Sequence, residues 1–512
     1  MNSVVAVSSL MGSLKYLGPN LAMAIGSLVL LMAGLWVRSS SVLTILTGIV
    51  LLTAAALNIP LLGLQSTQYF SGLVYHDAFS SFFGFLIPIV ILFAVVMGHY
   101  SKELLEDRKA EYMSLLLAFG CGLLFMSSSN HFLMLYLGIE MVSVLSYALA
   151  GFHRERQVSV EASMKYVVYG ALATGIMIFG MSLMYAVSGE LTISGMRNFL
   201  HSVPADSLPY LFWAGVIFSF AGFGYKISAA PMHMWTPDVY EGSPTPVAAL
   251  FSVAPKAAGF ALLIRFFVVG LSLPVVDQDL VLALTKNATQ PAYLAGGIVS
   301  WSKFFVISSV FTMFMGNLAA LGQTSVKRIL AYSSIAHAGY MLLGLTSQNK
   351  EGLSAIMFYI VVYCTMNLGA FWVASLVEDR MGGDSLREFK GLAKKAPLLA
   401  ILMSVFLFSL VGLPPFVGFI GKLYLFIAIL GQKMYGLAML AAVNSVISLY
   451  YYAKILKAMF LEKVSEGTLS VQSQIPKLVL VMLFILAVPN LVFGLYWEPL
   501  MSWAMTSLDF AR

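Results

Sequence analysis

Six ionisable residues lie inside stretches of this chain that are otherwise apolar enough to be buried in lipid: Glu140, Lys165, Lys226, Lys256, Arg265 and Lys422. Placing a charged side chain in hydrocarbon costs at least about 2.5 to 3.5 kcal/mol, so such residues normally mark an ion pathway or a buried pair. A lysine in a medium of low dielectric loses its proton more readily than it does in water. A row of such groups is therefore suited to passing protons, and the elements that carry them must hold them in line.

The composition assigns the chain to the polytopic membrane proteins. Of its 512 residues, 60% are hydrophobic and 10% are charged, whereas charged residues make up roughly 25% of a water-soluble domain. A spanning helix needs about 20 apolar residues, and apolar runs of this length recur with short polar loops between them. These runs do not alternate apolar with polar residues, which excludes a membrane β-barrel.

We therefore expect an all-α protein with about 14 transmembrane helices. The predicted spans cover residues 19–37, 41–63, 78–98, 112–128, 130–152, 161–187, 209–231, 246–270, 304–323, 328–346, 353–377, 397–429, 434–461 and 478–503. The longest polar stretches between them, near 99–112, 188–208, 271–303 and 378–396, are predicted to be connectors.

Two of the spans are broken, and each carries a lysine. The seventh contains Lys226 and runs into Pro231 and three further prolines, and the twelfth contains Lys422 and is interrupted by Gly412 and two prolines. Non-helical backbone at membrane depth is tolerated only where protein buries it or water reaches it. Corresponding interruptions in two halves indicate inverted repeats, here of five helices each. The predicted units are 1–110 (helices one to three), 111–270 (first repeat), 271–303 (connector), 304–461 (second repeat) and 462–512 (last helix).

The distribution of lysine and arginine predicts the orientation. With the amino terminus outside, the inner loops hold about twice as many of these residues as the outer segments, so both termini are predicted to lie outside. The net charge of +6 then follows from this topology, and no basic patch with interleaved aromatics indicates binding of nucleic acid. The sequence has neither a phosphate-binding glycine loop nor a CxxC pair, and Cys121 and Cys364 lack metal-ligand spacing, so neither a cofactor nor a metal is expected in this chain.

A set of motifs carries a family resemblance from about residue 75 to residue 460. They read GIEMVSVLSYALAGF, EASMKYVVYG, FGYKISAAPMHMWTPDVYEGSPTPV, KAAGFALLIRFF, KRILAYSSIAHAGYMLLG, GLPPFVGFIGKLY and SLYYYAKIL. In this order they resemble the N-type, antiporter-like membrane subunit of respiratory complex I, the proton-pumping NADH:quinone oxidoreductase. More distant relatives include the subunits of Mrp cation/proton antiporters.

The resemblance implies a proton-translocating module that is driven by quinone reduction elsewhere in its complex. It implies roles for six residues: Glu140 and Lys226 as the paired glutamate and lysine, Lys256 as the central lysine, Lys422 as the terminal lysine facing the outer exit, and Lys165 and His337 as further members of the proton path. The chain departs from the family pattern at Pro255, at the two methionines that flank His233, and in the length of the connector 271–303.

The resemblance also implies partners and a location. Quinone, FMN and iron–sulfur clusters are expected in other subunits, and the expected neighbours are the antiporter-like L-type and M-type subunits, the K-type and J-type subunits, and membrane lipid. A bacterial cytoplasmic membrane is expected, with a thylakoid membrane left open. Two other interpretations remain at this point: an Mrp-type sodium/proton antiporter subunit that uses the same lysines, and a purely structural membrane scaffold.

Each charged residue also has a plainer interpretation. Arg265 lies near a span end, where we expect its long side chain to reach the interface. Lys165 follows Glu161 by four residues, which is the spacing of a helical ion pair. His337 lies on a helix face of small residues, where hydrogen-bonded packing competes with a relay role. If Glu140 approaches Lys226, it favours the charged amine, and separating the two would release the proton toward Lys256.

Overall fold

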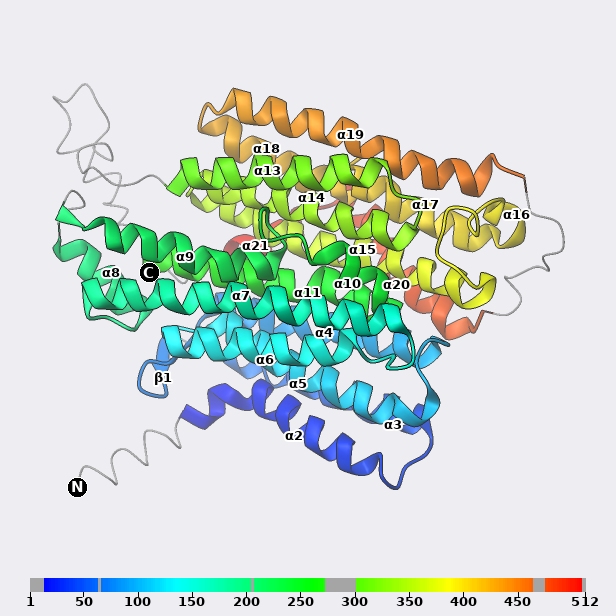
Figure 1. Ribbon diagram of the computed structural model, residues 1–512, viewed down its shortest axis with the longest axis horizontal. Coiled ribbons are helices and arrows are strands. Elements are labelled where there is room, and N and C mark those ends of the chain that lie inside the picture. Colours follow the sequence, from blue (N-terminus) through cyan, green and yellow to red (C-terminus); the bar gives the residue numbers. More distant parts are fainter. Residues whose placement is uncertain (1–12, 63–65, 204–206, 272–300, 464–474, 509–512) are drawn as a thin grey trace.

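The computed structural model describes residues 13–62, 66–203, 207–271, 301–463 and 475–508, and these residues form a bundle whose helices run side by side along its longest axis (Figure 1). Helices are expected here because an α-helix satisfies its backbone hydrogen bonds internally, which lipid cannot do. The amino-terminal elements are η1 (Leu14–Leu17), α2 (Gly18–Ala33), α3 (Ser40–Ala56), η2 (Ile59–Leu61), β1 (Thr67–Tyr69), β2 (Val74–His76) and α4 (Ala78–Tyr100).

The next elements make up the first predicted repeat. They are η3 (Glu106–Arg108), α5 (Lys109–Ser128), α6 (Phe132–Ala150), α7 (Gln157–Ser188), α8 (Ile193–Ser202), α9 (Tyr210–Ile227), α10 (Thr236–Gly242), α11 (Thr245–Leu263) and the π-helical segment η5 (Ile264–Gly270). The second predicted repeat and the carboxyl-terminal part contain α13 (Trp301–Leu321), α14 (Val326–Thr346), α15 (Lys350–Met381), α16 (Leu392–Lys395), α17 (Pro397–Val411), α18 (Val417–Gly431), α19 (Tyr435–Phe460), α20 (Lys477–Leu495) and α21 (Glu498–Thr506).

The prediction of an all-α protein with about 14 transmembrane helices is confirmed. Among the described residues, 13 helices are long and apolar enough to cross a membrane. The shorter apolar helices α17 and α18 follow each other within the twelfth predicted span and together supply one more crossing. The connector 271–303 lies almost wholly outside the described residues, which resume at α13.

Two features of the fold were not predicted. The stretch 188–208 was expected to be a connector, yet it contains the helix α8, which buries Ile193, Met196 and Leu200 along one side. A short antiparallel hairpin, β1–β2, precedes α4, and its turn places Phe70, Ser71 and Gly72 at positive φ. Both elements are too short and too polar to give a hydropathy signal of their own.

Both predicted breaks occur in the helices. Helix α9 ends at Ile227, its cap Ser228 is left-handed at φ 62°, and the next helix, α10, begins at Thr236. Helix α17 ends at Val411, its cap Gly412 is left-handed at φ 85°, and α18 begins at Val417. In each case a proline follows three residues after the left-handed cap. The recurrence of this pattern in both halves is what an internal repeat predicts.

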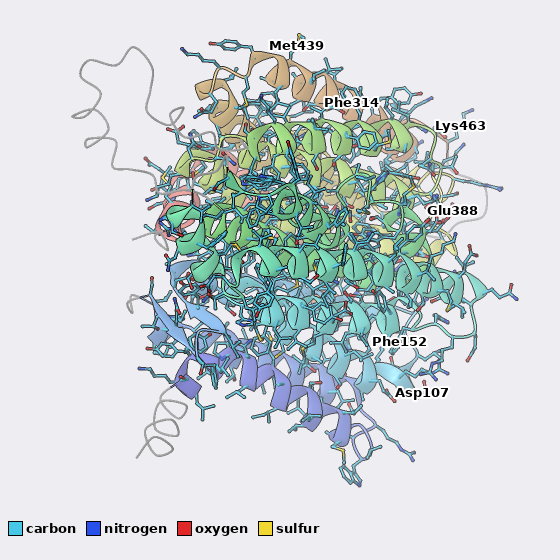
Figure 2. The ribbon with its side chains drawn as sticks, turned by 60° about the vertical axis from the view of Figure 1, so that its left-hand side comes forward. Asp107, Phe152, Phe314, Glu388, Met439 and Lys463 are labelled. Atoms are coloured by element: carbon cyan, nitrogen blue, oxygen red, sulfur yellow. The ribbon has the colours of Figure 1, made fainter. Side chains whose placement is uncertain are left out.

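The bundle has a protein-buried axis. In the most apolar window of each span, all residues from the Thr245–Gly270 span, 94% from Val326–Thr346 and 89% from Lys350–Met381 are buried, against 28% for Ser40–Leu61 and 39% for Tyr435–Phe460. Helices α11, α14 and α15 thus lie at the centre, and α3 and α19 turn most of their surface outward (Figure 1). Figure 2 shows Asp107 of η3, Glu388 and Lys463 at the same end of the bundle, although they come from three different connections between long helices.

Candidate functional site

Lys226 lies next to the end of α9, immediately before the first break. Its side chain is buried, and its Nζ donates a hydrogen bond to Ser143 Oγ of α6 at 2.8 Å. Glu140 lies three residues before Ser143 on α6, one helical turn away, and is half-buried. In the described part of the chain these two charged groups form no direct ion pair, although the carboxylate acts electrostatically on the amine. Glu140 and Ser143 lie on neighbouring turns of α6, and the hydroxyl of Ser143 is the group that contacts the amine.

Aromatic residues hold the backbone around this break. The rings of Tyr166 and Trp235 stack with centroids 4.3 Å apart. Tyr225 donates its hydroxyl proton to the carbonyl of Tyr166 at 2.9 Å, and Trp235 Nε1 donates to the carbonyl of Tyr225 at 3.1 Å. Because Tyr225 precedes Lys226 and Trp235 is the last residue before α10, this cluster fixes both ends of the break beside the lysine.

Lys256 lies in the middle of α11 and is 1% exposed. Its Nζ donates to the carbonyl and to Oγ of Ser334 on α14, at 2.6 and 2.9 Å. Pro255 sits inside the helix directly before it, as the sequence showed, and the helix continues through this proline. The central lysine is therefore held by neutral oxygen atoms.

His337 lies one turn further along α14 and is 2% exposed. Its Nδ1 is 2.7 Å from the hydroxyl of Tyr359, and its Nε2 is 3.3 Å from the hydroxyl of Tyr452, which in turn bonds to Ser333. The imidazole is within electrostatic reach of the amines of both Lys256 and Lys422. The histidine is thus hydrogen-bonded, as its plainer interpretation required, and it also lies between two of the predicted lysines.

Lys422 lies on α18, after the second break. Its Nζ donates to the carbonyls of Leu410 and Val411 at 3.1 and 2.7 Å, and it lies 4.6 Å from the centre of the Tyr340 ring. These carbonyls are among the last of α17, which have no intrahelical partner and carry the negative end of the helix dipole. The break in the helix thus creates the binding site for this amine.

Helix α14 (Val326–Thr346) contacts three of these sites in turn. Helix α14 supplies Ser334 to Lys256, His337 to the two tyrosines, and Tyr340 to Lys422, at intervals of three residues. The motif YSSIAHAGY contains all three, and their regular spacing is the signal that would have predicted Ser334 and Tyr340. Ser143, Tyr359 and Tyr452 come from distant helices, and only the folded structure shows their contacts.

Several buried polar atoms along this axis have no partner within the described residues. They include Tyr166 Oη, Ser228 Oγ, Thr236 Oγ1, Tyr363 Oη and Asn367 Oδ1. Buried polar groups are nearly always hydrogen-bonded, and where protein does not supply the partner, ordered water does. The arrangement of these atoms is therefore suited to a chain of water molecules.

Lys165 lies at the edge of the bundle. Its side chain is 40% exposed, and its Nζ is 2.7 Å from Glu161 Oε1 and 2.8 Å from Asp238 Oδ2. Arg328 also contacts Asp238, at 3.0 Å. Burial raises the pKa of the Asp238 carboxyl, but the hydrogen bonds and charges of Lys165 and Arg328 hold this pKa below its usual value. The structure thus contains the predicted ion pair with Glu161, enlarged by residues from α10 and α14.

The prediction that Arg265 reaches the interface is wrong. Its side chain is 3% exposed and forms two hydrogen bonds with Asp77, at 2.7 and 2.9 Å, and a third from Nε to the carbonyl of Ser127 at 2.5 Å. The Asp77 carboxylate lies 188 positions earlier in the chain. The hydropathy of the residues around Arg265 therefore could not predict this partner. A buried charge near a span end is satisfied here by a distant partner.

Helices of membrane length, two interrupted helices and a buried row of amines define a polytopic, antiporter-like membrane protein. Among the described residues, no group of three His, Cys, Asp or Glu side chains is placed to hold a metal ion. Comparison with known proteins agrees with this class. The family described as "NADH:quinone oxidoreductase/Mrp antiporter, TM" matches residues 129–286 and 289–448.

Individual relatives match over nearly the whole chain. NADH-quinone oxidoreductase subunit N of Anaeromyxobacter sp. (strain Fw109-5) is 39% identical and covers 96% of both chains. NADH-quinone oxidoreductase subunit N 2 of Sorangium cellulosum (strain So ce56) is 41% identical and covers 98% of both chains. A chain in the structure of respiratory complex I from Thermus thermophilus with bound aureothin is 28% identical, has a TM-score of 0.76, and covers 94% of this chain and 98% of that one. The protein belongs to the NADH:quinone oxidoreductase/Mrp antiporter family of membrane subunits.

Proposed function

We propose that this chain is the proton-translocating membrane-arm subunit of an NADH:quinone oxidoreductase, complex I. The observation that carries the proposal is the row of three buried amines, Lys226, Lys256 and Lys422, with His337 between the last two and with unpartnered polar atoms along the same axis. Burying three amines costs stability, and ionisable residues that are kept in membrane spans despite this cost normally mark an ion pathway or proton relay. The two curated relatives described above both bear the name of subunit N.

The proposed sequence of proton transfers uses the contacts described above. Glu140, one turn from Ser143, favours the charged form of Lys226 when it is near. When Glu140 and Lys226 separate, the ammonium of Lys226 gives its proton through water to the neutral amine of Lys256, and Lys226 becomes neutral. The proton then moves through His337, whose two nitrogens face Tyr359 and Tyr452.

The transfer ends at Lys422, from which the proton leaves on the side opposite to the loops rich in lysine and arginine. Those loops face the cytoplasm in this proposal, both termini lie outside, and the membrane is the bacterial cytoplasmic membrane. Lys165 has a supporting role at the cytoplasmic rim. The units 111–270 and 304–461 act as two inverted half-channels that meet at Lys256.

The energy for these transfers comes from the rest of the complex. In this proposal quinone, FMN and iron–sulfur clusters are bound by other subunits, and this chain contributes no electron transfer. Its neighbours are the L-type, M-type, K-type and J-type membrane subunits, which contact the apolar outer faces that are not covered by lipid. The broad exposed surfaces of α3 and α19 are available for such contacts.

The test is Lys256→Met in the assembled complex reconstituted into vesicles. Methionine keeps the length and apolar stem of lysine but cannot carry a proton. We expect proton uptake driven by NADH oxidation to fall roughly tenfold or more, because the central relay is lost. The control is Lys457→Met on the outer face of α19, an exposed lysine that should leave pumping unchanged.

Wild-type pumping by the Lys256→Met complex would refute the proposal, because both proton pumping and sodium/proton exchange through this chain would need the amine of Lys256. A second measurement replaces sodium by potassium in the buffer. Pumping that required sodium would identify the chain as an Mrp-type sodium/proton antiporter subunit, to which the family description extends.

A further inference from the structure

A second cluster of buried charges lies outside the row of amines, at the end of the bundle where α11 and α14 begin and α15 ends. It comprises Glu103, Thr245, Lys327 and Glu378, and we call it the terminal cluster. Lys327 Nζ is 3.1 Å from Glu378 Oε1, 3.9 Å from Glu103 Oε1 and 3.0 Å from Thr245 Oγ1. The exposed fractions of the side chains are 3% for Lys327, 9% for Glu103 and 13% for Glu378.

Thr245 joins the two carboxylates. Its backbone N–H donates to Glu103 Oε2 at 2.6 Å, and its hydroxyl donates to Glu378 Oε2 at 2.5 Å. As the first residue of α11, Thr245 has a free N–H at the positive end of the helix dipole, which favours a carboxylate. Both glutamates are thus fixed at the start of the helix that carries Lys256.

Carboxylates outnumber the cations around the terminal cluster. Lys327 faces Glu378, and Arg156 approaches Glu103 at 3.3 Å from the exposed side, so these four charges balance. The excess comes from neighbouring residues, because the field of Asp384 also reaches Lys327. Asp379, next to Glu378, accepts a hydrogen bond from the backbone N–H of Lys102 and adds a further negative charge. A group with an excess of carboxylate near the surface is suited to taking up a proton.

A polar seam leads from the terminal cluster toward Lys256. On α11, Ser252 and Lys256 follow Thr245 by seven and eleven positions, which places all three on nearly the same side of a helix with about 3.6 residues per turn. On α15, Asn367 precedes Glu378 by eleven positions and lies on its side for the same reason. Asn367 Nδ2 donates to Ser252 Oγ at 2.5 Å, which joins the two helices midway.

The seam also contains polar atoms that lack a protein partner. Asn367 Oδ1 and Tyr363 Oη are buried, and no described residue bonds to either. Tyr363 lies beside His337, with ring centres 5.2 Å apart. From Thr245 to Lys256 the helix rises about 16 Å, a distance that a few water molecules bonded to these atoms can bridge.

We propose that Glu378 is the proton-loading residue for Lys256, and that protons travel from it along the seam between α11, α14 and α15. Glu378 accepts a proton from hydronium at the loops rich in basic residues, which leaves water behind. It then gives this proton through water to Lys256, after that amine has passed the proton it received from Lys226 toward His337, and returns to the carboxylate. Lys256 in turn recharges Lys226 when Glu140 approaches it again. Lys327 supplies the counter-charge that keeps the carboxylate ionised between transfers. The proposal rests on the proposed function of Lys256.

The test compares four variants of the assembled complex in vesicles. Glu378→Gln keeps the shape of the side chain and its hydrogen bond with Thr245 but cannot take up a proton, so pumping should fall roughly tenfold or more. Glu378→Asp keeps the carboxylate and should restore most of the pumping, which a purely structural role in holding Thr245 does not predict. Glu388→Gln, at the same end of the bundle (Figure 2), is the matched control and should pump as the wild type does.

The fourth variant, Asn367→Leu, interrupts the seam without touching the terminal cluster and should lower pumping as Glu378→Gln does. If Glu378→Gln prevents assembly, this variant decides the question. Wild-type pumping by Asn367→Leu, or by an assembled Glu378→Gln complex, overturns the loading role. Lys256→Met measured beside them separates the two proposals: if it abolishes pumping while Glu378→Gln does not, only the inference about Glu378 fails.

Discussion

Removing the charge of Asp77 is expected to destabilise the protein more than most single substitutions do. Asn at this position can still accept the hydrogen bond that Asp77 Oδ1 accepts from the backbone N–H of Ser80, at 2.7 Å, at the start of α4. It cannot neutralise Arg265, whose guanidinium is 3% exposed and would keep only one strong acceptor, the carbonyl of Ser127. Breaking a buried ion pair from one side costs about 3–5 kcal/mol, and we expect Asp77→Asn to fall in this range.

The assay is the free energy of unfolding of the purified chain in mixed detergent micelles at pH 7. Arg265→Met should cost a similar amount, because it leaves the Asp77 carboxylate buried with Ser80 as its remaining donor. The double variant Asp77→Asn/Arg265→Met should cost less than either single variant, since it leaves no buried charge. A cost below about 1 kcal/mol for Asp77→Asn, or additive costs in the double variant, would refute the reasoning.

The pH dependence gives an independent check of the same pair. Burial raises the pKa of the Asp77 carboxyl, but the charge and hydrogen bonds of Arg265 and the hydrogen bonds of Ser80 hold this pKa below its usual value. A carboxyl with a lowered pKa in the folded state stabilises the protein at pH values above its unfolded pKa, about 3.9, and loses this contribution as the pH falls. The difference in stability between wild type and Asp77→Asn should therefore be constant from about pH 5 to pH 9 and should shrink only below about pH 4. A midpoint near neutral pH would contradict the assignment.

Two further predictions concern the lysines of the broken helices. Gly412→Ala should destabilise the chain by about 1–2 kcal/mol, because φ is 85° at this position. It should also reduce pumping, because the added Cβ would lie 2.9 Å from Lys422 Cδ. The control Gly382→Ala, at φ 80° with open space around it, should cause the same backbone strain without the loss of pumping. Ser143→Ala removes the hydroxyl that binds Lys226 and should lower the rate of proton uptake. Ser146→Ala removes a hydroxyl that donates to the carbonyl of Val142 within α6 and binds no lysine, so it should not. Unfolding in micelles measures the strain at the two glycines, and proton uptake into vesicles measures pumping. Equal losses of proton uptake within either pair of substitutions would contradict that prediction.

Local patterns in the sequence were sufficient to predict the spans and their interruptions. Hydropathy depends only on neighbouring residues, and the restriction that proline and glycine place on the backbone is also local, so α9, α17 and α18 could be anticipated within a few residues. Depth in the membrane could be predicted for the same reason, which is why Lys226, Lys256 and Lys422 were correctly expected to be buried. Their roles in transport remain a prediction.

The partners of the charged residues could not be predicted in this way. Arg265 and Asp77 are brought together by the packing of η5 against the start of α4, and no periodicity in either segment indicates the other. Glu103 and Glu378 fall within the predicted connectors 99–112 and 378–396 and were not singled out, although the fold buries both against Lys327. Membrane helices are apolar on most faces, so the sequence gives little information on which helix faces pack together. The packing of these faces determines every contact between distant helices.

The fold divides the cations of this chain into two kinds by the partner each one has. Near the ends of the bundle, Arg265, Lys327 and Lys165 each face a carboxylate, which favours one charge state and stabilises the protein while the pair is intact. Along the axis, in the described part of the chain, the amines bind neutral oxygen atoms: a hydroxyl for Lys226, a carbonyl and a hydroxyl for Lys256, and two carbonyls for Lys422. A hydroxyl can accept from an ammonium or donate to a neutral amine, and a neutral amine keeps two N–H groups that can still donate to carbonyls. These sites can therefore hold the side chain in place in both charge states. The capacity to change charge without losing position is what a proton relay requires, and it separates the axial lysines from the structural cations more sharply than depth in the membrane does.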